Sequence, residues 1–242
     1  MKKSYADIKA AAREHLLGSY GTVIGSSILL FAAVLLITIP FTRMLYTNPS
    51  AFQNVIYILA LLLILSLSKL FQCGILYMHL KLHRHQSITF QDFFTGLKKR
   101  PNRIISAGLT LALISLVCQI PASILSSMML IHTLNNQQIL LHILIIFIVI
   151  TAIGVILNIY LNLRFSLVLF LLIDYEDLEC RQAFAASSQY MKRQKVRLFF
   201  LMLSFIGYWF LGILSLGIGF LWIIPYIRQT MAEFYEEVKA EV

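Results

Sequence analysis

The sequence predicts an all-α fold: a polytopic membrane bundle of six transmembrane helices, with short amphipathic helices at the membrane interface. Three observations lead to this prediction. Hydrophobic residues make up 59% of the 242 residues, and charged residues only 13%, whereas soluble domains contain about 25% charged residues. The mean hydropathy is +0.81. Several uncharged runs are long enough for a spanning helix, which needs about 20 apolar residues. Together these features exclude a soluble enzyme or a soluble binding domain.

The charged residues bound the expected helices. The first uncharged run lies between Glu14 and Arg43 and has no signal-peptide cleavage pattern, so we expect it to be a retained first span. The run between Arg103 and Arg164 is too long for one helix, and the polar stretch 135–138 divides it. The first four spans are therefore expected at 20–40, from about 52, at 104–131 and at 139–163.

The last apolar run, between Arg197 and Arg228, is expected to form helices five and six. We place the turn at 214–219, because this stretch contains Gly217 and Gly219, and glycine allows a chain to turn. One long tilted helix is the alternative.

The basic residues predict the orientation of the chain. Segments on the side of both termini carry 17 Lys and Arg residues, and the opposite side carries Arg43 alone. Because basic loops stay in the cytoplasm, we expect residues 1–242 to form a single domain in the cytoplasmic membrane, with both termini cytoplasmic.

A weak pattern recurs at intervals of 85 residues, starting at Ser4, Thr89 and Asp174. Each copy offers a capping residue, an aromatic residue and an acid three positions after the first. Such residues favour the start of a helix. The pattern predicts three units of a short helix plus a hairpin, at 4–80, 89–163 and 174–238; a chance match is the alternative.

The sequence contains no recognisable catalytic, nucleotide-binding or nucleic-acid-binding motif, so we expect neither an enzyme nor a nucleic-acid partner. We expect no cofactor and no metal. His79 and His83 lie four apart, on one helical face, as two metal ligands would, but no nearby acid or cysteine completes a set. The glycines Gly21 and Gly25 have the spacing of a helix-packing motif.

Three basic residues, Lys69, Arg164 and Arg228, lie in the inner halves of predicted helices two, four and six. Charged groups at this depth are costly unless they reach the headgroups or find a partner. They are therefore candidate contacts for anionic headgroups. They either extend separately to the membrane surface or line one cavity that holds an anion.

Several segments resemble one bacterial family of integral membrane proteins. They are 8–9, 92–94, 164–167, Ser188 with Met191, 203–209, 217–222, 225–226 and 234–235. The family is catalogued as domain of unknown function 975, and its architecture is similar to the membrane domain of some glycerophosphodiester phosphodiesterases. The resemblance implies a membrane protein with lipid neighbours and no established activity.

We therefore expect a non-enzymatic, multi-pass membrane protein that acts through membrane lipids or other membrane proteins. The alternative is a transport, export or immunity component that handles a lipid or hydrophobic molecule. The oligomeric state stays open.

Overall fold

The computed structural model describes residues 3–47, 50–132 and 137–241, and within these ranges every regular element is a helix. This confirms the predicted all-α class. The elements are α1 (Tyr5–Leu16), α2 (Tyr20–Thr47), α3 (Ala51–His83), η1 (Phe90–Phe94), α4 (Thr95–Lys98), α5 (Pro101–His132), α6 (Gln137–Arg164), α7 (Val168–Asp174), α8 (Cys180–Tyr190), η2 (Met191–Arg193), α9 (Lys195–Leu203), α10 (Ile206–Leu214) and α11 (Phe220–Ala240).

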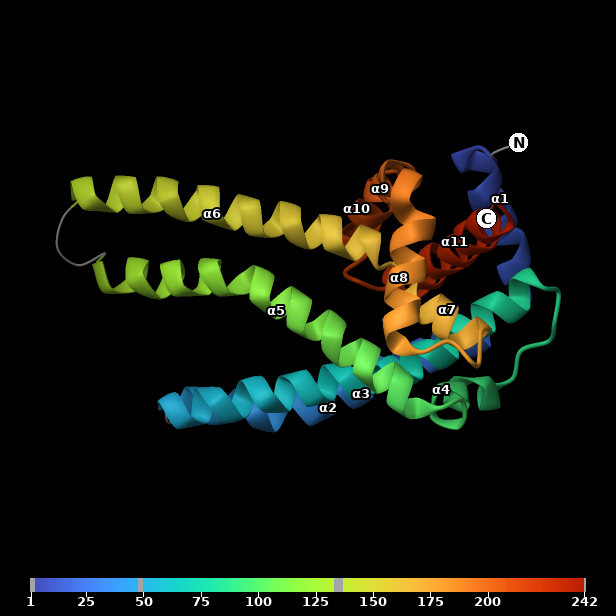
Figure 1. The fold of residues 1–242 in the computed structure, drawn as a ribbon, viewed down its shortest axis with the longest axis horizontal. Coiled ribbons are helices and arrows are strands. Elements are labelled where there is room, and N and C mark those ends of the chain that lie inside the picture. Colours follow the sequence, from blue (N-terminus) through green and yellow to red (C-terminus); the bar gives the residue numbers. More distant parts are fainter. Residues whose placement is uncertain (1–2, 48–49, 133–136, 242) are drawn as a thin grey trace.

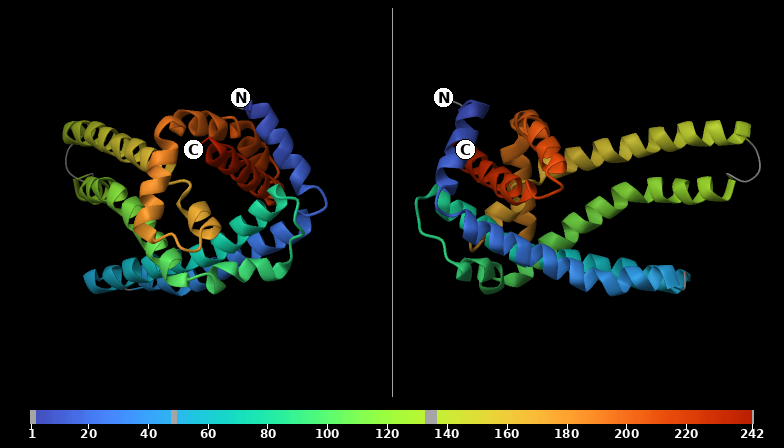
Figure 2. Two further views of the ribbon diagram at one scale, coloured as in Figure 1. Left: turned by 45° about the vertical axis from the view of Figure 1, so that its right-hand side comes forward. Right: turned by 180° about the vertical axis from the view of Figure 1, so that it is seen from behind.

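Two long helical hairpins, α2/α3 and α5/α6, project from one compact end of the molecule (Figure 1). The remaining short helices and α11 gather at this compact end (Figure 2), where α1, η1, α4, α7 and α11 contact α3. The described ends of the chain both lie there (Figure 1). The main core is also there: Ile8 of α1, Leu80 of α3, Phe170 of α7 and Tyr235 of α11 are each at most 2% exposed.

Among the residues that the structure describes, five segments are long and apolar enough to cross a membrane, so the predicted number of six spans is not confirmed. They are Tyr20–Met44, Phe52–His83, Pro101–Ser123, Leu144–Asp174 and Lys195–Leu214. The chain does turn at 215–219, where Leu216 and Gly217 have positive φ angles of 54° and 91°. The alternative of one long helix across this region is therefore wrong. The resulting α10–α11 hairpin is much shorter than the other two (Figure 2).

Two of the three predicted helix starts are confirmed. The Asp7 backbone N–H donates to Ser4 Oγ at 3.2 Å at the start of α1. The Thr89 backbone N–H donates to Asp92 Oδ2 at 2.8 Å at the start of η1. The third is wrong: Asp174 is the last residue of α7, and α8 begins after Glu179. Asp174 instead accepts hydrogen bonds from Arg84, directly after α3, and from Tyr235 and Lys239 of α11. The three-fold repeat is not confirmed.

Close helix packing involves glycines other than the predicted pair. A Cβ added to Gly21 or Gly25 would meet nothing within 4 Å, so the prediction that these residues pack within the monomer is wrong, while packing between two copies stays a prediction. A Cβ on Gly74 of α3 would lie 1.9 Å from the Phe93 carbonyl oxygen, and one on Gly96 would lie 2.0 Å from the Leu70 carbonyl oxygen. These two glycines let η1 and α4 lie directly against α3.

Candidate functional site

An apolar pocket of about 520 Å³ lies between α2, α3 and the α10–α11 hairpin. We call it the Arg228 pocket, because Arg228 is the one charged residue among the described residues of its lining. Its lining residues are Ile24, Ser27, Ile28, Leu30, Phe31, Val34, Leu65, Ser68, Gln72, Trp209, Gly217, Phe220, Leu221, Ile224, Pro225 and Arg228. Phe31 is 70% exposed and Trp209 is 48% exposed. The pocket therefore opens onto the outer surface of the helices, where a membrane would supply lipid.

The Arg228 side chain has a neutral hydrogen-bond partner. Its Nη1 donates to Ser27 Oγ at 3.3 Å. In residues 3–47, 50–132 and 137–241, no carboxylate forms an ion pair with it. A guanidinium group has five N–H donors, so most of its donors are left for another acceptor.

Lys69 lies on the other side of the same stretch of α3. Its Nζ donates to Gln72 Oε1 at 3.0 Å, and Gln72 also lines the Arg228 pocket. Lys69 itself lines a second pocket, of about 420 Å³, between α3, α5 and residues 162–169. Gln72 thus contacts Lys69 and lines the same pocket as Arg228.

Arg164 lies elsewhere. Its Nε donates to Ser188 Oγ of α8 at 2.8 Å, and its guanidinium carbon lies 5.4 Å from the centre of the Phe165 ring. It lines neither of the two pockets. The three predicted basic residues therefore do not converge on one cavity, because the end of α6 turns this side chain toward α8. Their contact with headgroups stays a prediction.

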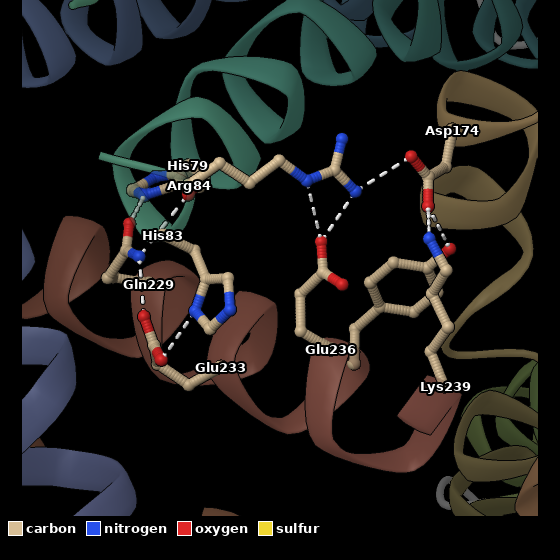
Figure 3. Close-up of polar contacts among 9 residues, drawn as sticks. His79, His83, Arg84, Asp174, Gln229, Glu233, Glu236 and Lys239 are labelled. Atoms are coloured by element: carbon tan, nitrogen blue, oxygen red, sulfur yellow. Dashed lines mark hydrogen bonds and ion pairs between the residues drawn. The ribbon is translucent and has the colours of Figure 1, made fainter. Parts of the chain in front are cut away.

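A network of polar side chains joins α11 to α3 at the compact end (Figure 3), and His15 of α1 also contacts it. At its centre is Glu233, whose side chain is only 1% exposed. His15 Nδ1 lies 2.6 Å from Glu233 Oε1, His83 Nδ1 lies 2.7 Å from Glu233 Oε2, and Gln229 Nε2 donates to Glu233 Oε1 at 2.9 Å. Burial alone would raise the pKa of Glu233, but the hydrogen bonds from His83, Gln229 and His15 outweigh it and lower the pKa to about 2. The carboxylate is therefore ionised at neutral pH.

A second part of the network joins α11 to α3 and α7 (Figure 3). Arg84 Nη2 donates to Glu236 Oε1 at 2.5 Å and to Asp174 Oδ1 at 2.8 Å. Asp174 Oδ2 accepts from Tyr235 Oη at 2.9 Å and from Lys239 Nζ at 2.5 Å. The charged half of α11 is thus held by ion pairs at the compact end.

The whole of residues 1–242 matches a protein family described as "Protein of unknown function (DUF975)". The chain belongs to this family. The resemblance found in the sequence is therefore confirmed, while the likeness to the membrane domain of glycerophosphodiester phosphodiesterases stays a prediction. No curated protein and no solved structure matches the chain.

Sequence reasoning missed the polar cluster around Glu233 in this family member. It paired His79 with His83, but His79 Nδ1 lies 2.8 Å from Gln229 Oε1 and not against Glu233. The acid that His83 contacts is 150 residues away in the sequence. No local spacing could have revealed this pair, because α11 reaches α3 only through the tertiary fold.

Proposed function

We propose that this protein is a non-enzymatic, multi-pass protein of the bacterial cytoplasmic membrane that binds an anionic phospholipid in the Arg228 pocket. The observation that carries this proposal is the Arg228 guanidinium, which lies in an apolar lining without a carboxylate partner in the part of the chain that the structure describes. The phosphate of the lipid is the missing partner, and an acyl chain occupies the apolar lining.

Electrostatics supports an anionic ligand. A charged side chain at membrane depth costs about 2.5–3.5 kcal/mol on insertion scales, and such residues normally pair with an opposite charge. Lys69 lies close by through Gln72 and adds a second positive charge. A guanidinium group can donate two parallel hydrogen bonds to a phosphate. A phosphate near Arg228 therefore offsets the cost of the Arg228 charge.

The chemistry of the lining favours binding over catalysis. The polar side chains in the lining of the Arg228 pocket are the hydroxyls of Ser27 and Ser68, the amide of Gln72 and the guanidinium of Arg228. This set has hydrogen-bond donors for a headgroup but no imidazole or carboxylate to act as a base. The volume of about 520 Å³ lies within the roughly 300–1,000 Å³ typical of ligand pockets.

The orientation that we propose places the compact end in the cytoplasm. In α11, the eight residues from Phe220 to Ile227 precede Arg228, and they extend only about 12 Å at 1.5 Å per residue. That is less than half of a hydrocarbon core of about 30 Å. We therefore propose that the α10–α11 hairpin enters the membrane and returns to the same side. Both termini are then cytoplasmic, in agreement with the excess of basic residues on that side.

Native mass spectrometry with defined lipids tests the proposal. We expect Arg228→Gln to lose most of the bound phosphatidylglycerol seen with the wild type, and to retain phosphatidylcholine at the wild-type level. Arg181→Gln is the matched control, because Arg181 is exposed on α8, outside the pocket. The proposal is wrong if Arg228→Gln retains as much phosphatidylglycerol as Arg181→Gln. Equal loss of both lipids would also contradict it, because the headgroup charge would then not be recognised.

A further inference from the structure

Three helices that are distant in the sequence bring possible metal ligands together at the compact end. His15 comes from the last turn of α1, His83 from the end of α3 and Glu233 from the middle of α11. One ligand atom from each of the three lies within 4.8 Å of the other two. The two His rings meet edge to face, with their centres 5.5 Å apart. Three donors thus surround one small volume.

The chemical nature of these donors suits a particular class of ion. Two imidazole nitrogens and one carboxylate form a set that binds Zn²⁺ and related divalent transition metals, usually with water at a fourth position. Ca²⁺ and Mg²⁺ prefer sites composed of oxygen ligands. The set carries one negative charge, on Glu233, and it is enclosed: the side chains of His15, His83 and Glu233 are 13%, 25% and 1% exposed.

We propose that His15, His83 and Glu233 bind one divalent transition-metal ion of the zinc class, which joins α1, α3 and α11. The ligands are already oriented toward a common point, since both Nδ1 atoms face the Glu233 carboxylate. The ion takes the place of the proton on each Nδ1: a neutral imidazole then carries its proton on Nε2, and an imidazolium releases one proton to water, so that each ring binds as a neutral imidazole.

The distances fit this exchange. The His nitrogens lie 2.6 and 2.7 Å from the Glu233 oxygens, which are hydrogen-bond distances. Ligands about 2.1 Å from a tetrahedral ion lie about 3.4 Å from one another. Side-chain rotations that move these atoms apart by less than about 1 Å therefore open the space for an ion.

The surroundings support the carboxylate. Gln229 Nε2 donates to Glu233 Oε1 at 2.9 Å and to the His79 backbone oxygen at 3.2 Å. His79 Nδ1 in turn lies 2.8 Å from Gln229 Oε1. Such partners orient a metal-binding side chain, and their loss typically weakens metal affinity about 10–100-fold.

The test is a titration of the full-length protein in detergent, after treatment with a chelator, with Zn²⁺ and with Co²⁺. We expect one ion per chain and, for Co²⁺, the intense visible absorption of a tetrahedral site. Zn²⁺ should also raise the midpoint of thermal unfolding, because it binds the folded state. If the wild-type protein shows no saturable one-to-one binding, the proposal is wrong; this result does not depend on any variant.

Variants then test the ligand set. Glu233→Gln and His83→Gln should each weaken binding at least about 100-fold, since a direct ligand should matter at least as much as its supporting partners. Glu236→Gln is the matched control for the carboxylate, because Glu236 contacts Arg84 instead. His85→Gln is the control for a neighbouring imidazole, because its exposed ring contacts His15 but is not part of the set. The assigned ligands are wrong if either control loses as much affinity as His83→Gln, or if Glu233→Gln and His83→Gln both bind as the wild type does.

Discussion

Replacing Gly74 by Ala should destabilise the fold, because the new methyl group has no room. Its Cβ would lie 1.9 Å from the carbonyl oxygen of Phe93 and 2.5 Å from the carbonyl carbon, whereas contacts under 3.0 Å essentially never occur. These are backbone atoms, so no side-chain rotation relieves the clash. The whole η1 segment has to move away from α3, and the stacked rings of Phe71 and Phe93, with centres 5.1 Å apart, have to separate.

The size of the effect follows from two opposing terms. Overpacking of a filled interior costs about 1–3 kcal/mol, and a clash with a fixed backbone belongs at the upper end. Alanine in place of a helical glycine stabilises the helix by up to about 1 kcal/mol, because alanine has the higher helix propensity. We therefore expect a net loss of about 2 kcal/mol. For a chain of this size such a loss lowers the midpoint of thermal unfolding by about 4–8 °C.

Gly25→Ala is the matched control, because a Cβ there meets nothing within 4 Å. It keeps the gain in helix propensity without the clash, so it should leave stability unchanged or raise it by up to about 1 kcal/mol. The assay is heating of the detergent-solubilised variants followed by size-exclusion chromatography of the protein that remains folded. If Gly74→Ala and Gly25→Ala unfold at the same temperature, the close contact between α3 and η1 is wrong. If Gly25→Ala is the more damaging variant, the predicted packing motif in α2 is right after all.

Three further predictions concern orientation and the polar contacts of the compact end. Reporter fusions after residues 46 and 135 should report the outside, and those after 90, after 190 and at the C-terminus the cytoplasm; a C-terminal fusion that reports the outside contradicts the proposed return of the α10–α11 hairpin. Burial would raise the pKa of Asp92, but hydrogen bonds from Thr89 and Lys81 lower it below the usual 3.8. The ionised carboxylate therefore stabilises the fold above about pH 4, and this contribution is lost as the pH falls below 3.8. Asp92→Asn should lower the free energy of unfolding by about 1–2 kcal/mol at neutral pH, and its stability should approach that of the wild type in acid. If the variant and the wild type differ in stability as much in acid as at neutral pH, the stabilising role of the ionised Asp92 carboxylate is wrong. Tyr235→Phe removes the hydroxyl that donates to Asp174 at 2.9 Å and should cost about 1–3 kcal/mol in thermal unfolding, whereas no loss would mean that Lys239 and Arg84 satisfy Asp174 alone.

Hydropathy and local capping patterns were sufficient for the long helices and for two short ones. The uncharged runs predicted α2, α3, α5 and α6, because a spanning helix satisfies all its backbone hydrogen bonds internally and needs only length and apolar side chains. The starts of α1 and η1 were also predictable, since a capping residue and an acid three positions later act within one turn. The same local rule failed at Asp174, where contacts with α3 and α11 determine the role of the carboxylate.

The sequence by itself therefore determined an all-helical membrane protein with apolar hairpins, because these features depend on residues close together in the chain. The tertiary structure alone decided that Gly74, and not Gly25, lies against a neighbouring backbone. It also decided that Arg164 is separated from Lys69 and Arg228. It joined His15 to Glu233 across 218 residues. Contacts of this kind depend on how whole helices pack, and periodicity or spacing along the chain carries no information about a partner so far away.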